Sequence, residues 1–409
     1  MDDENILDSR YSWWRLFLSL MTGSVASIGI WSFIAIMPAV QAEFEISRGT
    51  ASFPYVVSMV GFGLGNLLAG RMVDRFGVTI SLIVSALVLG AGFSLSTLAP
   101  SLTVLSLTHL LIGLGSAVGF GPLMADISHW FMRRRGVAVT ICASGNYIAG
   151  ALWPWALSDL LDVDGWRSFY LTLAGLVLAV VIPLALMLRR RAPAGALAAA
   201  GARAQAAQMS AGLSPRTLQL LLALAGFGCC MAMSMPQVHI VAYCVDLGYG
   251  PAPGTEMLSL MLLGGVVSRV LSGFLADLIG GLRMLILGSF LQCVALMLYI
   301  PYDGLASLYI VSLVFGLSQG GLVPAYAIIV REYLPPAEAG ARVGVVIMAT
   351  VIGMAVGGWV SGWIYDLTSS YTAAFLNGVA WNLVNLAVAL TILTRSRPRA
   401  PLDARPRGA

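Results

Sequence analysis

The chain has 409 residues and contains no lysine, so all 23 of its basic residues are arginines. Charged residues of either sign make up only 10% of the chain, whereas a soluble protein carries about 25%. This shortage of charge argues against a soluble globular protein.

Metal ligands and catalytic groups are also scarce. The three histidines are far apart, and the five cysteines, at positions 142, 229, 230, 244 and 293, lie inside apolar runs without the spacing of a metal site. The glycine-rich stretches GFGLG and GLGSAVG lie inside apolar runs with no strand before them, so they indicate close helix packing and not a dinucleotide site. We therefore expect no metal, no cofactor and no enzymatic activity.

Long apolar runs dominate what is present. Apolar residues make up 58% of the chain, and a run of about 20 of them is long enough to cross a bilayer as a helix. The N-terminal stretch MDDENILDSRYSWW is acidic and polar, unlike a cleavable signal peptide. The sequence thus predicts an all-α polytopic membrane protein. We predict twelve spans, at residues 16–40, 51–73, 79–99, 103–130, 137–160, 168–188, 217–245, 254–276, 282–301, 305–330, 340–365 and 372–394.

The arginines indicate how these spans are oriented. If the N-terminus is inside, the cytoplasmic loops and tail hold the clusters at 133–135, 189–191 and 395–407, and only Arg48 and Arg167 fall in outward loops. Basic residues concentrate on the cytoplasmic side of membrane proteins, so both termini are expected there. The net charge of +4 follows from this topology and calls for no nucleic-acid partner.

The chain repeats itself at an offset of 203 residues. GRMVDRFG at 70–77 aligns with GFLADLIG at 273–280, and Gly113 aligns with Gly316 in two glycine-rich stretches. Because each match falls at the same place within six spans, the chain reads as two parallel halves, an architecture in which a site at the interface can face alternate sides of a membrane. The predicted parts are a first bundle at 1–191, a cytoplasmic linker at 192–215, a second bundle at 216–395 and a basic tail at 396–409.

The repeated G-x-x-x-D-x-x-G pattern resembles the signature loop of the major facilitator superfamily. Within that superfamily, WFMRRRGVAVTICASG at 130–145 and the stretch at 331–366 resemble the bacterial monocarboxylate-transporter and oxalate/formate-antiporter branch. The resemblance covers about residues 15–395. It implies two pseudo-symmetric six-helix bundles, a central cavity and secondary active transport in a bacterial cytoplasmic membrane. We expect the transporter to be a monomer.

The signature loops are expected to act in gating and packing. Asp74 and Asp277 occupy the same place in the two copies, where a carboxylate can meet a helix N-terminus or an arginine of a neighbouring loop. Arg75 follows Asp74 directly. The glycines of the motif are expected to let helices approach closely.

Arg269 is the one charged residue between Met257 and Ala276. It lies eight residues before Asp277, or about 12 Å along a helix, which is too far for its side chain to reach cytoplasmic water. A charge facing lipid is costly, so we expect Arg269 to face a polar central cavity. The repeat aligns it with Asn66. It is either an anion site or a structural arginine bonded to carbonyls of broken helices, and we expect the anion site.

A guanidinium matches one carboxylate with two parallel hydrogen bonds. No second basic residue falls at that depth, so we expect a small monocarboxylate such as lactate, pyruvate, another hydroxy- or oxo-acid, or an aromatic acid. The resemblance agrees, because the arginine of the eighth span binds carboxylate in that branch. A carboxylate or dicarboxylate exchanger and a non-transporting carboxylate receptor are the alternatives.

Further candidates are assigned more loosely. Substrate-lining candidates are Tyr326, Phe120, Asn146, Tyr147, Trp31 and Asn66, and proton-coupling candidates are His109, Asp126 and His239. We expect Asp126 to pair with Arg133 or its neighbours. Proton-coupled transport is expected, although carboxylate exchange and facilitated diffusion stay open at this point.

Overall fold

A computed structural model of the chain describes residues 7–131, 135–190, 209–210, 212–334 and 339–398, apart from a few side chains within these ranges. Twelve helical segments in this part are long and apolar enough to cross a membrane, as predicted. The elements are α1 (Arg10–Ala26), α2 (Gly29–Phe44), α3 (Arg48–Ala51), α4 (Phe53–Phe76), α5 (Val78–Ser96), α6 (Leu102–Ser116), the short 3-10 helix η2 (Ala117–Gly119), α7 (Gly121–Ser128), α8 (Arg135–Ala156), α9 (Ser158–Met187), β1 (Met209–Ser210), α11 (Pro215–Asp246), α12 (Pro251–Ile279), α13 (Gly281–Leu298), α14 (Leu305–Gln319), α15 (Leu322–Tyr333), α16 (Ala339–Thr368), α17 (Thr372–Arg395) and β2 (Arg397–Pro398).

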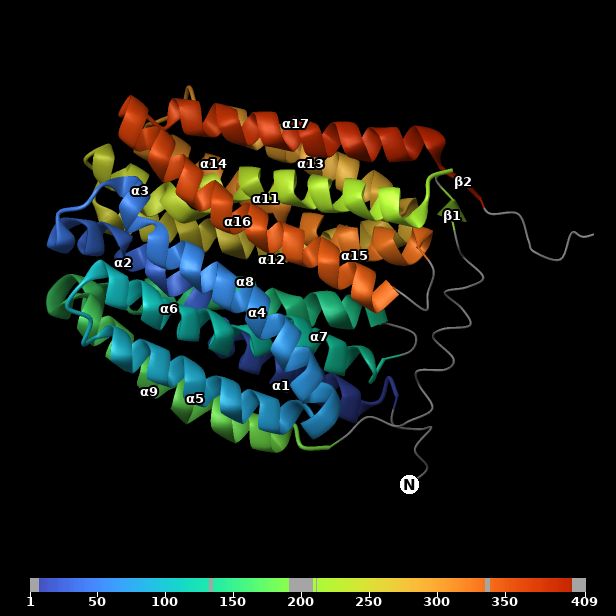
Figure 1. Ribbon diagram of the computed structural model, residues 1–409, viewed down its shortest axis with the longest axis horizontal. Helices are drawn as coiled ribbons and strands as arrows, with labels where there is room; N and C mark the ends of the chain where they lie inside the picture. The colour runs from blue at the N-terminus through green and yellow to red at the C-terminus, as the bar shows by residue number, and fades with distance from the viewer. Residues whose placement is uncertain (1–6, 132–134, 191–208, 211, 335–338, 399–409) are drawn as a thin grey trace, which may run out of the picture.

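The helices form two groups, one from each half of the chain. In Figure 1 the blue to green helices of the first half, apart from α3, lie together below the yellow-green to red helices α11–α17, and α3 lies beside the second group. The two groups meet where α8 packs on α12, where α3 and α4 pack on α16, and where α2 packs on α11. Leucines on the outer surface are exposed, among them Leu107, Leu220 and Leu271, as expected for a surface in contact with lipid.

Three of the predicted spans are broken helices. The first span is interrupted at residues 27–28 between α1 and α2. The fourth is interrupted around η2, and the tenth at residues 320–321 between α14 and α15. The last two breaks correspond at the repeat offset, since residue 117 at the start of η2 and Gly320 are 203 apart. A break releases backbone carbonyls from the helical ladder and makes them available to side chains.

Two glycines that correspond in the repeat allow the same close approach of two helices in each half. A Cβ atom added to Gly113 would collide with the carbonyl oxygen of Ser58, and one added to Gly316 would collide with that of Met261. The α4–α6 and α12–α14 pairs are therefore in backbone contact, which only glycine permits.

The glycines of the signature loop behave differently from this expectation. Gly77 and Gly280 end α4 and α12 with φ of 86° and 85°, a region that favours glycine. A Cβ on Gly70 would meet none of the described atoms within 4 Å, and one on Gly273 would make an ordinary contact with Thr140 at 3.4 Å. Within the described part, Gly70 therefore shows no close helix approach, whereas the last glycine of each loop is required to turn the chain.

A short antiparallel pairing of β1 with β2 joins the segment before α11 to the segment after α17. In Figure 1 it lies at the end of the molecule where α1 begins and α17 ends. Residues 191–208 and 399–409, which include most of the predicted linker and tail, lie outside the described residues.

Candidate functional site

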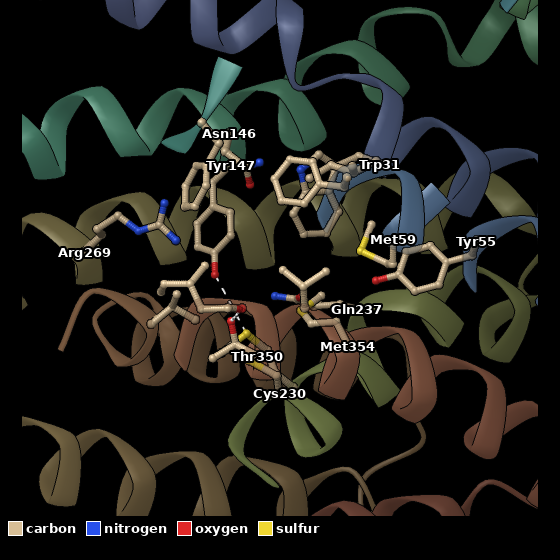
Figure 2. Close-up of a pocket in the computed structure, with 17 residues that line it drawn as sticks. Trp31, Tyr55, Met59, Asn146, Tyr147, Cys230, Gln237, Arg269, Thr350 and Met354 are labelled. Carbon is tan, nitrogen blue, oxygen red and sulfur yellow. Dashed lines mark hydrogen bonds between the residues drawn. The ribbon is translucent and has the colours of Figure 1, made fainter. Parts of the chain in front are cut away.

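A cavity lies between the two halves of the molecule (Figure 2). The centres of water-sized molecules have about 80 Å³ available in it. Most of its lining is apolar, with contributions from α2, α4, α11, α15 and α16. The apolar lining includes Ile30, Met59, Phe62, Met233, Val323 and Met354. A site of this kind binds a small molecule by apolar contact and fixes its orientation with a few polar groups.

Arg269 is the cation of this cavity. It projects from α12 and is only 2% exposed. Its Nε donates to the carbonyl of Gly320 at 3.1 Å, and its Nη1 donates to the carbonyl of Ala143 at 2.7 Å. The guanidinium carbon lies 3.9 Å from the centre of the Tyr147 ring, within range of a cation–π interaction.

The two carbonyls come from different halves. Gly320 lies in the break between α14 and α15, and Ala143 lies on α8 of the first half. These bonds are of the kind expected of a structural arginine. They orient the guanidinium, but carbonyl dipoles leave its full positive charge in place.

No carboxylate within the described part of the chain neutralises Arg269. The ion pairs there join Arg15 to Asp126, Arg48 to Asp246 and Arg167 to Glu43. A buried charge without a counter-ion is costly. An anion that entered the cavity would supply the missing partner.

Five of the predicted residues lie at this cavity, namely Arg269, Tyr147, Asn146, Trp31 and Phe120. The Trp31 and Tyr147 rings meet edge to face, with centroids 5.9 Å apart. Figure 2 shows Arg269 at one end of the group and Tyr55 at the other, with Tyr147 and Gln237 between them.

Two predicted residues do not line this cavity. Asn66 donates to the carbonyl of Phe62 at 2.8 Å, one turn back on its own helix. The Tyr326 hydroxyl donates to Oδ1 of Asn385 at 2.7 Å, inside the second half. The side chain of Tyr326 satisfies its hydroxyl in the core of one bundle and not at the interface.

Several lining residues were not predicted. Gln237 could have been predicted to line the cavity, since it is polar within an apolar span. Its Nε2 donates to Oε1 of Gln319 at 2.7 Å. The sequence does not identify the other three, Tyr55, Cys230 and Thr350, because nothing in an apolar span shows which face of the helix points toward the cavity. All five cysteines are free and buried, as expected of small apolar residues.

The proton-coupling candidates lie away from the cavity lining. His109 bonds to the carbonyl of Leu105 through Nδ1 at 2.7 Å and to the Tyr170 hydroxyl through Nε2 at 3.0 Å. Asp126 pairs with Arg15 at 2.7 Å. Arg133, the predicted partner, lies outside the described residues. The partner that the structure shows is on α1, which packs against α7.

His239 belongs to a cluster that joins the halves at the end of the molecule opposite the termini. We call Arg48, Asp246, Asp366, Tyr371 and His239 the Arg48 cluster. Arg48 forms two bonds to Asp246, at 3.0 and 3.1 Å, and its Nη1 donates to the Tyr371 hydroxyl at 2.7 Å. The backbone N–H groups of Arg48 and the next residue donate to Asp366 at 2.9 and 2.7 Å.

The cluster also fixes the tautomer of its histidine. Nε2 of His239 lies 2.7 Å from the carbonyl of Gly358, so this nitrogen carries the proton. Nδ1 then accepts from the Tyr371 hydroxyl at 3.3 Å. Burial raises the pKa of Tyr371, which keeps its phenol protonated and able to donate.

The gating candidates are only partly described. Asp74 and Asp277 lie in the last turns of α4 and α12, and their side chains lie outside the described residues. Arg75 is exposed, with its guanidinium carbon 5.2 Å from the centre of the Phe76 ring. Across the described residues, no group of three or more His, Cys, Asp or Glu side chains is placed to hold a metal ion.

Comparisons with known proteins agree with this architecture. Residues 19–268 and 245–408 match the family model of the Major Facilitator Superfamily. Monocarboxylate transporter 13 of Rattus norvegicus is 29% identical over 94% of this chain and 92% of its own length. The Bos taurus protein of the same name is 29% identical over 93% of this chain and 89% of its own length.

Solved structures share the fold at low sequence identity. A bacterial homologue of the human lysosomal transporter Spinster, in an inward-facing and occupied conformation, has a TM-score of 0.71 at 13% identity and covers 95% of this chain and 97% of its own. The proton:xylose symporter XylE has a TM-score of 0.68 at 13% identity over 94% and 95%. With twelve spans in two bundles and a family model that matches nearly its whole length, the chain belongs to the Major Facilitator Superfamily.

Proposed function

We propose that this protein is a secondary transporter that carries a small monocarboxylate across a membrane by alternating access. The observation that supports this most is Arg269, a buried cation at the cavity between the halves without a counter-ion in the described part of the chain. The relatives named monocarboxylate transporters support the substrate class. We further propose a bacterial cytoplasmic membrane, a monomer, and cytoplasmic termini, since the arginines gather at that end.

A monocarboxylate fits the charge of the site better than a dicarboxylate does. One guanidinium compensates one carboxylate. The rest of the lining is apolar or neutral, so a second carboxylate would be desolvated without a partner. Carboxylate exchange on the same site is the second candidate function, because Arg269 serves either mode equally.

Proton coupling is part of the proposal. His239 is the candidate that the geometry favours, because the carbonyl to which it is bonded belongs to Gly358. A Cβ on Gly358 would lie 3.0 Å from the ring of Tyr55, which lines the cavity. Protonation of His239 would therefore change the electrostatic potential both at the cavity and in the Arg48 cluster.

Uptake of labelled lactate into proteoliposomes tests this function. We expect uptake that an inward proton gradient accelerates, and exchange of labelled for unlabelled lactate without a gradient. Exchange alone would favour the exchanger. Binding with neither uptake nor exchange would show a receptor and contradict transport.

A further inference from the structure

Two hydrogen-bond donors at the cavity lack an acceptor. Nε1 of Trp31 and the hydroxyl of Tyr55 have no hydrogen-bond partner among the residues that the structure describes. Both side chains are buried, at 3% and 1% exposure, and both line the cavity. They come from α2 and α4 in the first half, whereas Arg269 comes from α12 in the second.

The two donors lie away from the guanidinium. Figure 2 shows Tyr55 at the opposite end of the group from Arg269, with its hydroxyl directed toward Met59 and Gln237, and Trp31 on the same side. The side chains between the two ends include the rings and thioethers of Tyr147, Met233 and Met354. The amide of Gln237 lies between the two ends as well, and its Oε1 has no partner among the described residues. The cavity therefore has a cationic end, a mostly apolar middle that contains this one amide, and a neutral donor end.

Buried polar groups are almost always hydrogen-bonded, so two unpaired donors in one cavity call for a partner. An indole N–H can only donate, which means that the partner must be an acceptor. A methyl group at this place would leave both donors unpaired, and unpaired buried donors lower affinity. A carbonyl, hydroxyl or ether oxygen would satisfy them.

We propose that the substrate carries a second, uncharged oxygen that accepts from Trp31 and Tyr55 while its carboxylate meets Arg269. This inference rests on the proposed function and narrows its substrate class to oxo- or hydroxy-carboxylates with the oxygen remote from the carboxylate. About 80 Å³ is available to the centres of water-sized molecules, and one water needs about 10–15 Å³ of such volume, so the cavity accommodates only a small acid.

A matched pair of ligands tests the inference. We would measure the binding of 4-oxopentanoate and 4-methylpentanoate to the purified full-length protein by titration calorimetry. The two acids have the same number of non-hydrogen atoms and the same carboxylate, and differ in an acceptor oxygen against a methyl group. We expect the wild type to bind the oxo-acid about tenfold more tightly.

Two variants locate the preference. Tyr55→Phe removes the hydroxyl and keeps the ring, and Trp31→Phe removes the indole N–H. Each is expected to reduce the ratio of oxo-acid affinity to methyl-acid affinity by about threefold to tenfold. Binding of 4-methylpentanoate by each variant shows in the same titration that the variant is folded.

The outcomes separate this inference from the proposed function. Equal binding of the two acids by the wild type would contradict the proposed role of Trp31 and Tyr55 as donors. Equal weakening of both acids by Tyr55→Phe would contradict it too. Either result would remain consistent with a monocarboxylate site at Arg269. Failure of the wild type to bind either acid would overturn both. A preference that persists in Arg269→Gln without loss of affinity would support the donor end and contradict the carboxylate site at Arg269.

Discussion

Two buried arginines of this protein have opposite surroundings. Arg15 is 1% exposed and is paired with Asp126. It also donates to the carbonyl of Leu188 at 3.1 Å and lies 4.4 Å from the centre of the Trp130 ring. Arg269 contacts carbonyls and a ring but no acid among the described residues. The same residue type is therefore paired with an acid at one position, whereas at the other we propose that it binds the carboxylate of the substrate.

Replacing Arg15 should damage the fold. Arg15→Leu leaves the Asp126 carboxylate buried and unpaired, which should lower the free energy of unfolding by about 3–5 kcal/mol. The control is Arg167→Leu, which removes a pair whose side chains are 42% and 36% exposed and should change it by less than about 1 kcal/mol. Denaturant unfolding in detergent measures both. Equal effects of the two variants would contradict a structural role for Arg15.

At the scale of elements, the broken helices produce the site. Because α14 ends at Gln319 and α15 begins at Leu322, the Gly320 carbonyl is available to Arg269. One turn before this break, α14 approaches α12 closely. That approach is set by Gly316, whose backbone touches Met261.

A methyl group at Gly316 should therefore disturb both packing and site. Gly316→Ala is expected to lower the free energy of unfolding by about 1–3 kcal/mol, the usual range for overpacking, and to weaken carboxylate binding. Gly175→Ala on α9 is the control, because a Cβ there meets nothing within 4 Å. Thermal unfolding with and without lactate measures both effects. A melting temperature of Gly316→Ala equal to that of Gly175→Ala would show that the close approach is dispensable.

The sequence predicts elements better than the contacts between them. Apolar runs predict the twelve spans because the bilayer sets their length. The break at 27–28 was missed, because Ser27 and Ile28 carry no helix-breaking signal. Arg269 can be predicted because it is a lone charge in an apolar run. Tyr55 cannot be predicted, because α4 is apolar on every side around it and the sequence does not show which side faces the cavity. The pairing of Arg15 with Asp126 joins residues 111 positions apart, a distance at which no local pattern acts.

At the scale of the whole molecule, the Arg48 cluster holds the two halves together at one end. It joins α3 of the first half to α11, α16 and the start of α17 in the second. The proposed alternating access would require this end to open, and these bonds would then break in each cycle. Arg269 bridges the halves as well, through the carbonyl of Ala143 on α8. A relative movement of the halves would therefore alter the environment of the substrate cation.

Weakening the Arg48 cluster should shift the protein toward a state open at that end. Cys230 lines the cavity and is buried, so it serves as a reporter once the other four cysteines are replaced by alanine. Arg48→Gln should increase its labelling by an impermeant thiol reagent, applied from the Arg48 side, by about tenfold. Arg167→Gln, which removes a pair within the first half at the same end, should leave the rate unchanged. Equal rates in all three proteins would argue against a latch.

The central claim concerns the charge of Arg269, and direct binding of lactate tests it. Arg269→Gln keeps hydrogen-bonding capacity but removes the charge, so lactate affinity should fall on the order of 100-fold. Arg269→Lys restores the charge without the planar fork and should recover part of the loss. The exposed Arg283→Gln is the matched control and should bind like the wild type. If Arg269→Gln binds lactate as tightly as the wild type and Arg283→Gln do, Arg269 is a structural arginine and the proposed carboxylate site is wrong.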